Sequence, residues 1–175
     1  MNFKHKILLI VLIALFTGCG DSKPKPKPWQ EFVSTEHKFK ALFPGEPVTG
    51  PKQTNKMPGG SIDSYTISRV EGKFKYEIVY SELPSLYKNF PVDKLLNSLI
   101  DNTLKTLNAA NVKKTDVNVN SFRGREVEFD LPDNMAGKGR IAVDGNRVFI
   151  IIMKVPKENI ASADIAKFLD SLEIK

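Results

Sequence analysis

The chain has 175 residues and a formal net charge of +6, with one cysteine and two histidines. This length suits one domain with a hydrophobic core of its own. Five of the 26 basic residues and one of the 20 acidic residues precede Trp29, which leaves 21 basic and 19 acidic residues from there on. That near balance gives no support for binding to nucleic acid. The single cysteine excludes an intramolecular disulfide and a metal site built on cysteine pairs.

The first residues have the pattern of an export signal. Lys4 and Lys6 precede an unbroken apolar run over residues 7–16, and small residues follow. Ten residues rise only about 15 Å as a helix, whereas a membrane span takes roughly 20 residues. We therefore expect residues 1–18 to form a signal peptide that is removed, which leaves a mature chain beginning at Cys19.

The end of this segment, Leu15-Phe16-Thr17-Gly18-Cys19, resembles the lipobox of bacterial lipoproteins. The resemblance implies a diacylglycerol on the Cys19 thiol, cleavage just before it and acylation of the new amine. Phe16 departs from the pattern, which more often has Leu or Val there. Gly20 stands where lipoproteins retained at the inner membrane often have Asp. The resemblance therefore implies a lipid-anchored envelope protein, at the outer membrane facing the periplasm rather than at the inner membrane.

A tether is expected between this anchor and the folded domain, over residues 19–28. It has alternating lysine and proline and no apolar side chain to bury, so it favours an extended polyproline II conformation of about 28 Å. Its lysines Lys23, Lys25 and Lys27 can contact anionic lipid. One folded domain is expected over residues 29–175.

Alternating apolar residues and turn signals predict the strands of this domain. The expected strands are 29–34, 38–43, 62–70, 73–83, 112–119, 125–131, 139–144 and 147–155. Residues 46–60, rich in Pro, Gly, Lys and Asn, are expected to form a long surface loop. A two-residue turn at Glu71-Gly72 would place Ile67 opposite Tyr76.

Two helices are expected, over residues 91–108 and 161–172. The first carries an apolar stripe that includes Leu95, Leu96, Ile100 and Leu104, and the second has Ile165, Phe168, Leu169 and Leu172 inward. Every position from Val148 to Met153 is apolar, so that strand should be central and covered on both faces. The sequence thus predicts an α+β domain, an antiparallel β-sheet covered by two main helices in an α-β-α sandwich.

Three segments resemble PsbP-like exported bacterial proteins. Residues 38–47 are similar to their (K/R)-F-x-(V/A)-x-F-P-G-x-P opening, residues 124–129 to their G-R-E-x-x-F strand and residues 168–172 to their closing F-L-D-S-F helix. The resemblance implies the PsbP-like fold over almost the whole domain. Members of this wider fold act as partner-binding modules rather than enzymes, so it also implies architecture more than activity.

No catalytic, cofactor or metal site is expected. His37, the one histidine after the signal, lies in a short turn and is expected to be solvated rather than a catalytic base. A G-x-S-x-G elbow and an H-E-x-x-H motif are both missing from the sequence. The glycine-rich stretches 57–60 and 137–140 lack the spacing of nucleotide-binding loops and are interpreted as turns.

An acidic row, Glu126, Glu128 and Asp130, has the spacing of paired catalytic carboxylates. Folding the strand back through residues 132–137 would place Glu128 beside Arg140 and Asp130 beside Lys138, with Val127 against Ile141. These cations would keep the acids ionised, whereas a general acid needs a raised pKa. Cross-strand ion pairs are therefore the expected role.

The sequence predicts a non-enzymatic binding or assembly module, held at a membrane through acyl chains on Cys19, whose partner is an unidentified envelope protein. The partner surface is expected at the 46–60 loop or at the Tyr and Lys residues of the 62–82 hairpin. The alternative is a small-ligand carrier with an apolar pocket between sheet and helices. A pocket above roughly 300 Å³ would favour the carrier and a fully packed core the module.

Overall fold

The computed structural model describes residues 28–57 and 59–175. The expected signal peptide, Cys19 and the tether up to residue 27 lie outside these residues, so lipidation stays a prediction. Within the described residues the chain forms eleven β-strands, two α-helices and two short 3-10 helices. No helix in this part of the chain is long and apolar enough to cross a bilayer.

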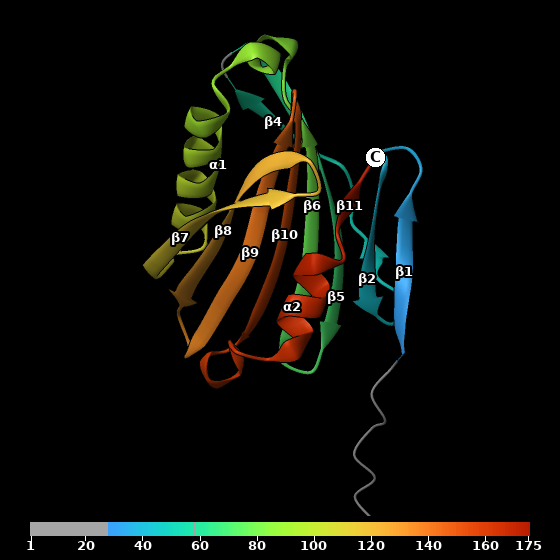
Figure 1. Ribbon diagram of the computed structural model, residues 1–175, viewed down its shortest axis with the longest axis vertical. Helices are drawn as coiled ribbons and strands as arrows, with labels where there is room; N and C mark the ends of the chain where they lie inside the picture. Colours follow the sequence, from blue (N-terminus) through green and yellow to red (C-terminus); the bar gives the residue numbers. More distant parts are fainter. Residues whose placement is uncertain (1–27, 58) are drawn as a thin grey trace, which may run out of the picture.

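A main sheet of eight antiparallel strands forms the centre of the molecule (Figure 1). The strands follow the order β3-β5-β6-β10-β9-β8-β7, and β4 also pairs with β5. Their bounds are β3 Val48–Thr49, β4 Gln53–Met57, β5 Gly60–Glu71, β6 Phe74–Glu82, β7 Ala110–Val119, β8 Phe122–Leu131, β9 Met135–Asp144 and β10 Arg147–Pro156. The uninterrupted apolar strand β10 lies at the centre, as its pattern predicts.

A three-stranded small sheet and one helix cover one face of the main sheet, which we call the small-sheet face (Figure 1). The small sheet consists of β1 (Trp29–Ser34), β2 (Phe39–Pro44) and β11 (Glu173–Ile174), and α2 (Ala163–Asp170) lies beside it. The covered core is rich in aromatic rings and contains Phe39, Phe43, Tyr76, Tyr80, Phe149 and Phe168. The inward residues predicted for the second helix are all buried.

The opposite face, which we call the helix face, carries α1 (Val92–Thr106). This helix follows the 3-10 helix η1 (Ser85–Asn89) and packs on β8 and β9. The second 3-10 helix, η2 (Lys157–Asn159), follows β10. The core on the helix face is mainly aliphatic, with Leu95, Leu96, Ile100, Leu104, Val127, Phe129, Ile141 and Ile152. The predicted apolar stripe of α1 is confirmed, since its members Leu95, Leu96, Ile100 and Leu104 are buried. It could be read from the sequence because a period of 3.6 residues depends on local sequence alone.

The predicted sheet covered by two main helices is wrong. A helix is about 10 Å wide and neighbouring strands are about 4.8 Å apart, so one helix covers only about two strands. The main sheet is much wider than that, α2 has only 8 residues, and most of the cover on its side comes from a second sheet. The described chain is mostly β-strand, with the small sheet and α2 packed side by side on one face of the main sheet and α1 on the other.

Two predicted hairpin registers are wrong by two residues. Ile67 pairs with Ile78 rather than Tyr76, because the two-residue loop is Gly72-Lys73, with Gly72 at a φ of 60°. Glycine at the first central position suits a type II′ turn. In the β8–β9 hairpin, Glu126 rather than Glu128 lies opposite Arg140, and the loop ends at Asn134 instead of running to residue 137.

Two segments expected to be irregular are strands. Residues 46–60 contain β3 and β4, which pair with β5 and extend the main sheet. Residues 137–140 lie inside β9 instead of forming a turn. A Cβ at Gly137 would overlap the ring of Phe129, and one at Gly139 would lie 2.7 Å from the carbonyl oxygen of Ile151. These glycines therefore allow close packing within a strand. The other stretch is a turn as predicted, since Met57 pairs with Gly60.

Candidate functional site

A groove opens on the helix face beside α1, over β5, β6 and the adjoining side of β10. Its volume is about 460 Å³, within the range of roughly 300–1,000 Å³ that small-molecule sites occupy. Asn55 of β4 lies on one wall, and Asn102 and Thr106 of α1 lie on the other, all three exposed. The groove is therefore open to solvent along its rim.

The pleat of three neighbouring strands builds the floor of the groove. Thr66 of β5, Val79 of β6 and Ile150 of β10 lie in one row across the sheet. Glu77 lies opposite Ile152 in the next row on the same face, and Lys75 lies opposite Lys154 in the row beyond. Because every second residue of a strand points to the same face, these side chains form one continuous surface.

One end of the floor carries a buried ion cluster. The carboxylate of Glu77 is 2.7 Å from the Lys154 Nζ and 2.8 Å from the Lys75 Nζ, and its side chain is 12% exposed. Burial would raise the pKa of Glu77, but the hydrogen bonds and charges of the two lysines outweigh it and hold that pKa below its usual value. Glu77 is thus ionised at neutral pH, and the cluster has a net charge of +1.

Several hydroxyl groups around the groove are already bonded within the protein. Thr103 Oγ1 donates to the Leu99 carbonyl over 2.8 Å, and Thr106 Oγ1 donates to the Asn102 carbonyl over 2.9 Å. The hydroxyls of Ser64 and Ser81 bond to each other over 2.8 Å. The hydroxyl protons of Thr103 and Thr106 are therefore not available to a ligand in the groove.

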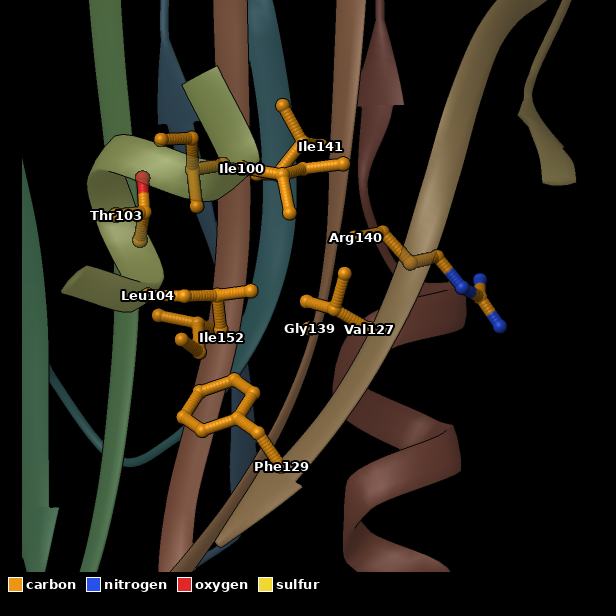
Figure 2. Close-up of a pocket in the computed structure, with 10 residues that line it drawn as sticks. Ile100, Thr103, Leu104, Val127, Phe129, Gly139, Arg140, Ile141 and Ile152 are labelled. Carbon is orange, nitrogen blue, oxygen red and sulfur yellow. The ribbon is translucent and has the colours of Figure 1, made fainter. Parts of the chain in front are cut away.

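The space enclosed between α1 and the sheet is filled. Figure 2 shows Ile100 and Leu104 of α1 facing Ile152 and Phe129 of the sheet, whereas Arg140 points away from them. The remaining cavity is about 10 Å³, which is too little for any organic ligand. The expected apolar pocket between sheet and helix therefore has no room directly beneath α1, and the usable volume lies beside the helix.

His37 is packed rather than solvated. Its ring lies between those of Tyr65 and Tyr80, with centroid distances of 4.4 and 4.3 Å, and its side chain is 13% exposed. The β1–β2 turn places it over these two tyrosines, which face each other across β5 and β6. The ring therefore covers the edge of the aromatic core, and the expectation of a solvated side chain is wrong.

Two hollows of about 440 and 470 Å³ flank His37. Two acidic side chains of the second hollow are already engaged within the protein. Asp63 accepts hydrogen bonds from Thr54 Oγ1 at 2.6 Å and from Lys52 Nζ at 3.1 Å, and these bonds hold its pKa below the usual value. Glu82 accepts from the Asn146 side chain at 3.3 Å. Glu36, which lines both hollows, is 79% exposed and lies 3.9 Å from His37.

The acidic row of β8 forms ion pairs on the small-sheet face. Glu126 lies 2.9 Å from Arg140 Nε and 3.0 Å from Lys138 Nζ. Burial would raise the pKa of Glu126, but these two cations outweigh it and lower that pKa. Asp130 bonds to Asn111 and Lys157, which also lowers its pKa. Neither group has the raised pKa of a general acid. The predicted ion pairs form with different partners, since Glu126 rather than Glu128 meets Arg140 and Asp130 bonds to Asn111 and Lys157 rather than to Lys138.

The other predicted positions are distributed as follows. Tyr76 and Tyr80 of the 62–82 hairpin are 1% and 5% exposed, so they cannot form the expected partner surface. Burial raises the pKa of Tyr76 to about 12.

Among the described residues there is no group of three or more His, Cys, Asp or Glu side chains placed to hold a metal ion. Cys19 lies outside these residues.

Glu77 and Lys154 are the groove residues that sequence reasoning missed. Both lie in strands whose neighbours are mostly apolar, and they are far apart along the chain. Glu77 lies on the more polar face of β6, with Lys75 and Val79, and its contact with Lys154 follows from the pairing of β6 with β10, which the sequence does not show. The one signal in the sequence was Lys154, a charged residue that directly follows the apolar run from Val148 to Met153.

Comparisons with known proteins identify the fold. No family model matches the sequence, and no curated protein matches it. The solution structure of cyanobacterial PsbP (CyanoP) from Synechocystis sp. PCC 6803 superposes with a TM-score of 0.57 at 11% identity, over 91% of this chain and 99% of that one. A protein from Bacteroides thetaiotaomicron VPI-5482 gives a TM-score of 0.48 at 16% identity, over 83% of this chain and 48% of that one. The likeness to CyanoP confirms the PsbP-like fold, and at this identity it concerns the fold alone.

Proposed function

We propose that the protein is a lipid-anchored binding module of the bacterial cell envelope and that the groove on the helix face is its binding site. The groove itself supports this proposal most directly. It is an open hollow of about 460 Å³ with exposed walls and an ion cluster in its floor, beside a core that is otherwise filled. The apolar side chains of Val79 and Ile150 on the floor of the groove are only half-buried. Contiguous apolar surface that is left open in this way is typical of a binding site.

The proposal of an anchor rests on residues 1–28. The basic start, the short apolar run and the Leu15–Cys19 sequence support lipidation of Cys19, and Gly20 supports the outer membrane. The expected tether ends directly before Trp29, the first residue of β1, so it would link the anchor to the small sheet rather than to the strands under the groove.

Binding in the groove is tested by placing a photoreactive amino acid at Asn102 in the full chain, in its native membrane. Asn102 lines the groove, whereas Lys105 on the same helix does not, so a label at Lys105 is the matched control. We expect a covalent adduct of defined mass from position 102 alone. Equal labelling from both positions, or none from 102, would contradict the proposal.

The anchor is tested by the intact mass of the membrane-extracted protein beside a Cys19→Ser variant. We expect a chain that starts at Cys19 and carries acyl chains, with both features lost in the variant. An unmodified mass would contradict lipidation and leave the groove experiment unaffected.

A further inference from the structure

We propose that the groove binds an amphiphile with one aliphatic chain and one anionic group, with the anion held at Lys154, beside the Glu77–Lys75 pair. This inference rests on the proposed function, since it names the ligand class of the same groove. Three features of the described residues carry it: an aliphatic floor, hydroxyl groups that are already bonded, and an excess positive charge at one end.

The surface that the groove offers is aliphatic. Its apolar lining consists of Ile62, Val79, Leu107, Ile150 and Ile152, and no aromatic ring is found among the described lining residues. Thr103 and Thr106 donate their hydroxyls to carbonyls of their own helix, which leaves their methyl groups as the surface beside the floor. A flexible hydrocarbon chain gains from burial against such a surface because the contact needs no direction.

The charge lies at one end only. Lys154 Nζ has three N–H donors, and within the described chain its ion pair is with Glu77 alone. Glu77 balances one of the two lysines, whose side chains are 20% (Lys154) and 43% (Lys75) exposed, so the cluster keeps one uncompensated positive charge. A carboxylate or phosphate entering from the groove would accept the remaining donors and neutralise this charge. The cluster therefore selects a single anionic group.

The dimensions of the groove fit such a molecule. Ile62 and Glu77 lie at opposite ends of the groove floor. Asp63 pairs with Glu82 of β6, so its neighbour Ile62 lies six positions along the strand direction from Glu77, which corresponds to about 20 Å at roughly 3.3 Å per residue. The volume of about 460 Å³ suits one chain rather than a two-chain lipid, which would extend into solvent.

An acidic peptide is the competing occupant, and the floor disfavours it. An extended peptide needs partners for its N–H and C=O groups along its length. The floor strands already pair with each other through their backbones, so only side chains face the groove. Among the described residues, the groove side chains left to serve a peptide backbone are Asn55, Asn102 and Thr66, with Lys154 at one end.

The test uses the full chain in phosphatidylcholine vesicles with a photoreactive palmitic acid as the probe. We expect labelling of peptides that contain Val79, Ile150 or Ile152. The corresponding alcohol, with the same chain and no anion, should label about tenfold less, because it lacks the charge-assisted hydrogen bonds. A photoreactive single-chain lysophosphatidylglycerol, tested in parallel, distinguishes a free fatty acid from a lipid headgroup as the source of the anion.

Two variants separate the anion site from general stability. Lys154→Met should reduce labelling by the acid about tenfold, and Lys75→Met, which keeps the Glu77–Lys154 pair, should reduce it by a smaller factor. Lys113→Met on β7, far from the groove, is the control and should leave labelling unchanged. Circular dichroism checks that each variant is folded.

Equal labelling by acid and alcohol, or undiminished labelling of both groove variants, would overturn the inference. Two results distinguish this failure from failure of the proposed function. If the label at Asn102 captures a peptide or protein while both amphiphile probes fail, the groove binds a different class of ligand and only this inference is wrong. If the label at Asn102 also fails, the proposed function is wrong as well.

Discussion

The two faces of the main sheet differ in the chemistry of their cores and in how completely they are covered. The small-sheet face buries aromatic rings under a second sheet and α2, and Phe39, Phe149 and Phe168 are each 0% exposed there. The helix face buries aliphatic side chains under one helix, which covers β8 and β9 and leaves the groove beside it. The comparison indicates that one face supplies most of the stability and that the other combines a packed half with a binding surface.

The largest expected effect tests the aromatic core. Phe149→Ala should lower the free energy of unfolding by about 4 kcal/mol, because the ring is fully buried and contacts the rings of Phe39 and Tyr80. Val79→Ala, in the groove on the other face, should cost less than about 1 kcal/mol. Urea denaturation of both variants measures the difference. Similar losses would contradict the proposed division between the two faces.

A second prediction concerns the packed half of the helix face. Gly137→Ala should cost about 2 kcal/mol, because the added methyl group overlaps the ring of Phe129, which is 1% exposed and cannot move aside. Gly50→Ala is the control, since its new Cβ would meet nothing closer than the Thr66 carbonyl oxygen at 3.5 Å. Thermal denaturation should show a clear loss for the first variant and almost none for the second.

A third prediction concerns the open half of the same face and its pH dependence. Glu77→Gln should cost about 2 kcal/mol at pH 7, because two charge-assisted hydrogen bonds are lost. The pKa of Glu77 is lowered in the folded protein, so its stabilisation is present above the ordinary carboxyl pKa of about 4.3 and is lost as the pH falls through the lower folded value.

The difference between the wild type and Glu77→Gln should therefore shrink below about pH 4. Glu36→Gln, at a side chain that is 79% exposed, should match the wild type throughout. A difference that stayed constant from pH 7 to pH 3 would show that the Glu77 charge is not the stabilising feature.

The smallest expected effect lies at the rim of the small-sheet face. His37→Ala should cost about 1 kcal/mol by removing the ring stacked between Tyr65 and Tyr80, and His37→Phe should restore most of that loss. Rescue by phenylalanine would confirm a packing role. Failure of that rescue would require a role for the imidazole nitrogens.

The sequence alone predicted the elements that depend on local pattern. The stripe of α1 and the inward residues of α2 are correct because the helical period can be read from a few consecutive turns. The register of the β5–β6 and β8–β9 hairpins could not be predicted from the apolar pattern. A shift of two residues keeps every side chain on its face, so alternation alone cannot detect it. Only the loop residues, Gly72-Lys73 and 132–134, determine the pairing.

The groove was not predictable because it depends on what α1 leaves uncovered. Pattern can show that one face of β6 is polar at Glu77, but the same pattern is typical of a solvated edge. The lysines that bury this carboxylate come from the same strand and from β10, and the wall comes from α1. The glycines of β9 were wrongly predicted as a turn for a related reason. Gly137 makes room for the ring of Phe129 on β8, and Gly139 for the Ile151 carbonyl oxygen and the Ile152 side chain of β10.

The pairing of β11 with β2 has a consequence for when the protein can fold. The Leu42 N–H donates to Ser171 Oγ and the Lys175 N–H donates to the Lys38 carbonyl, so the second strand of the domain is paired with its last strand. Contacts between such distant segments form late and slow the search for the native state. A chain that leaves the ribosome amino end first cannot close its aromatic core until its final residues emerge.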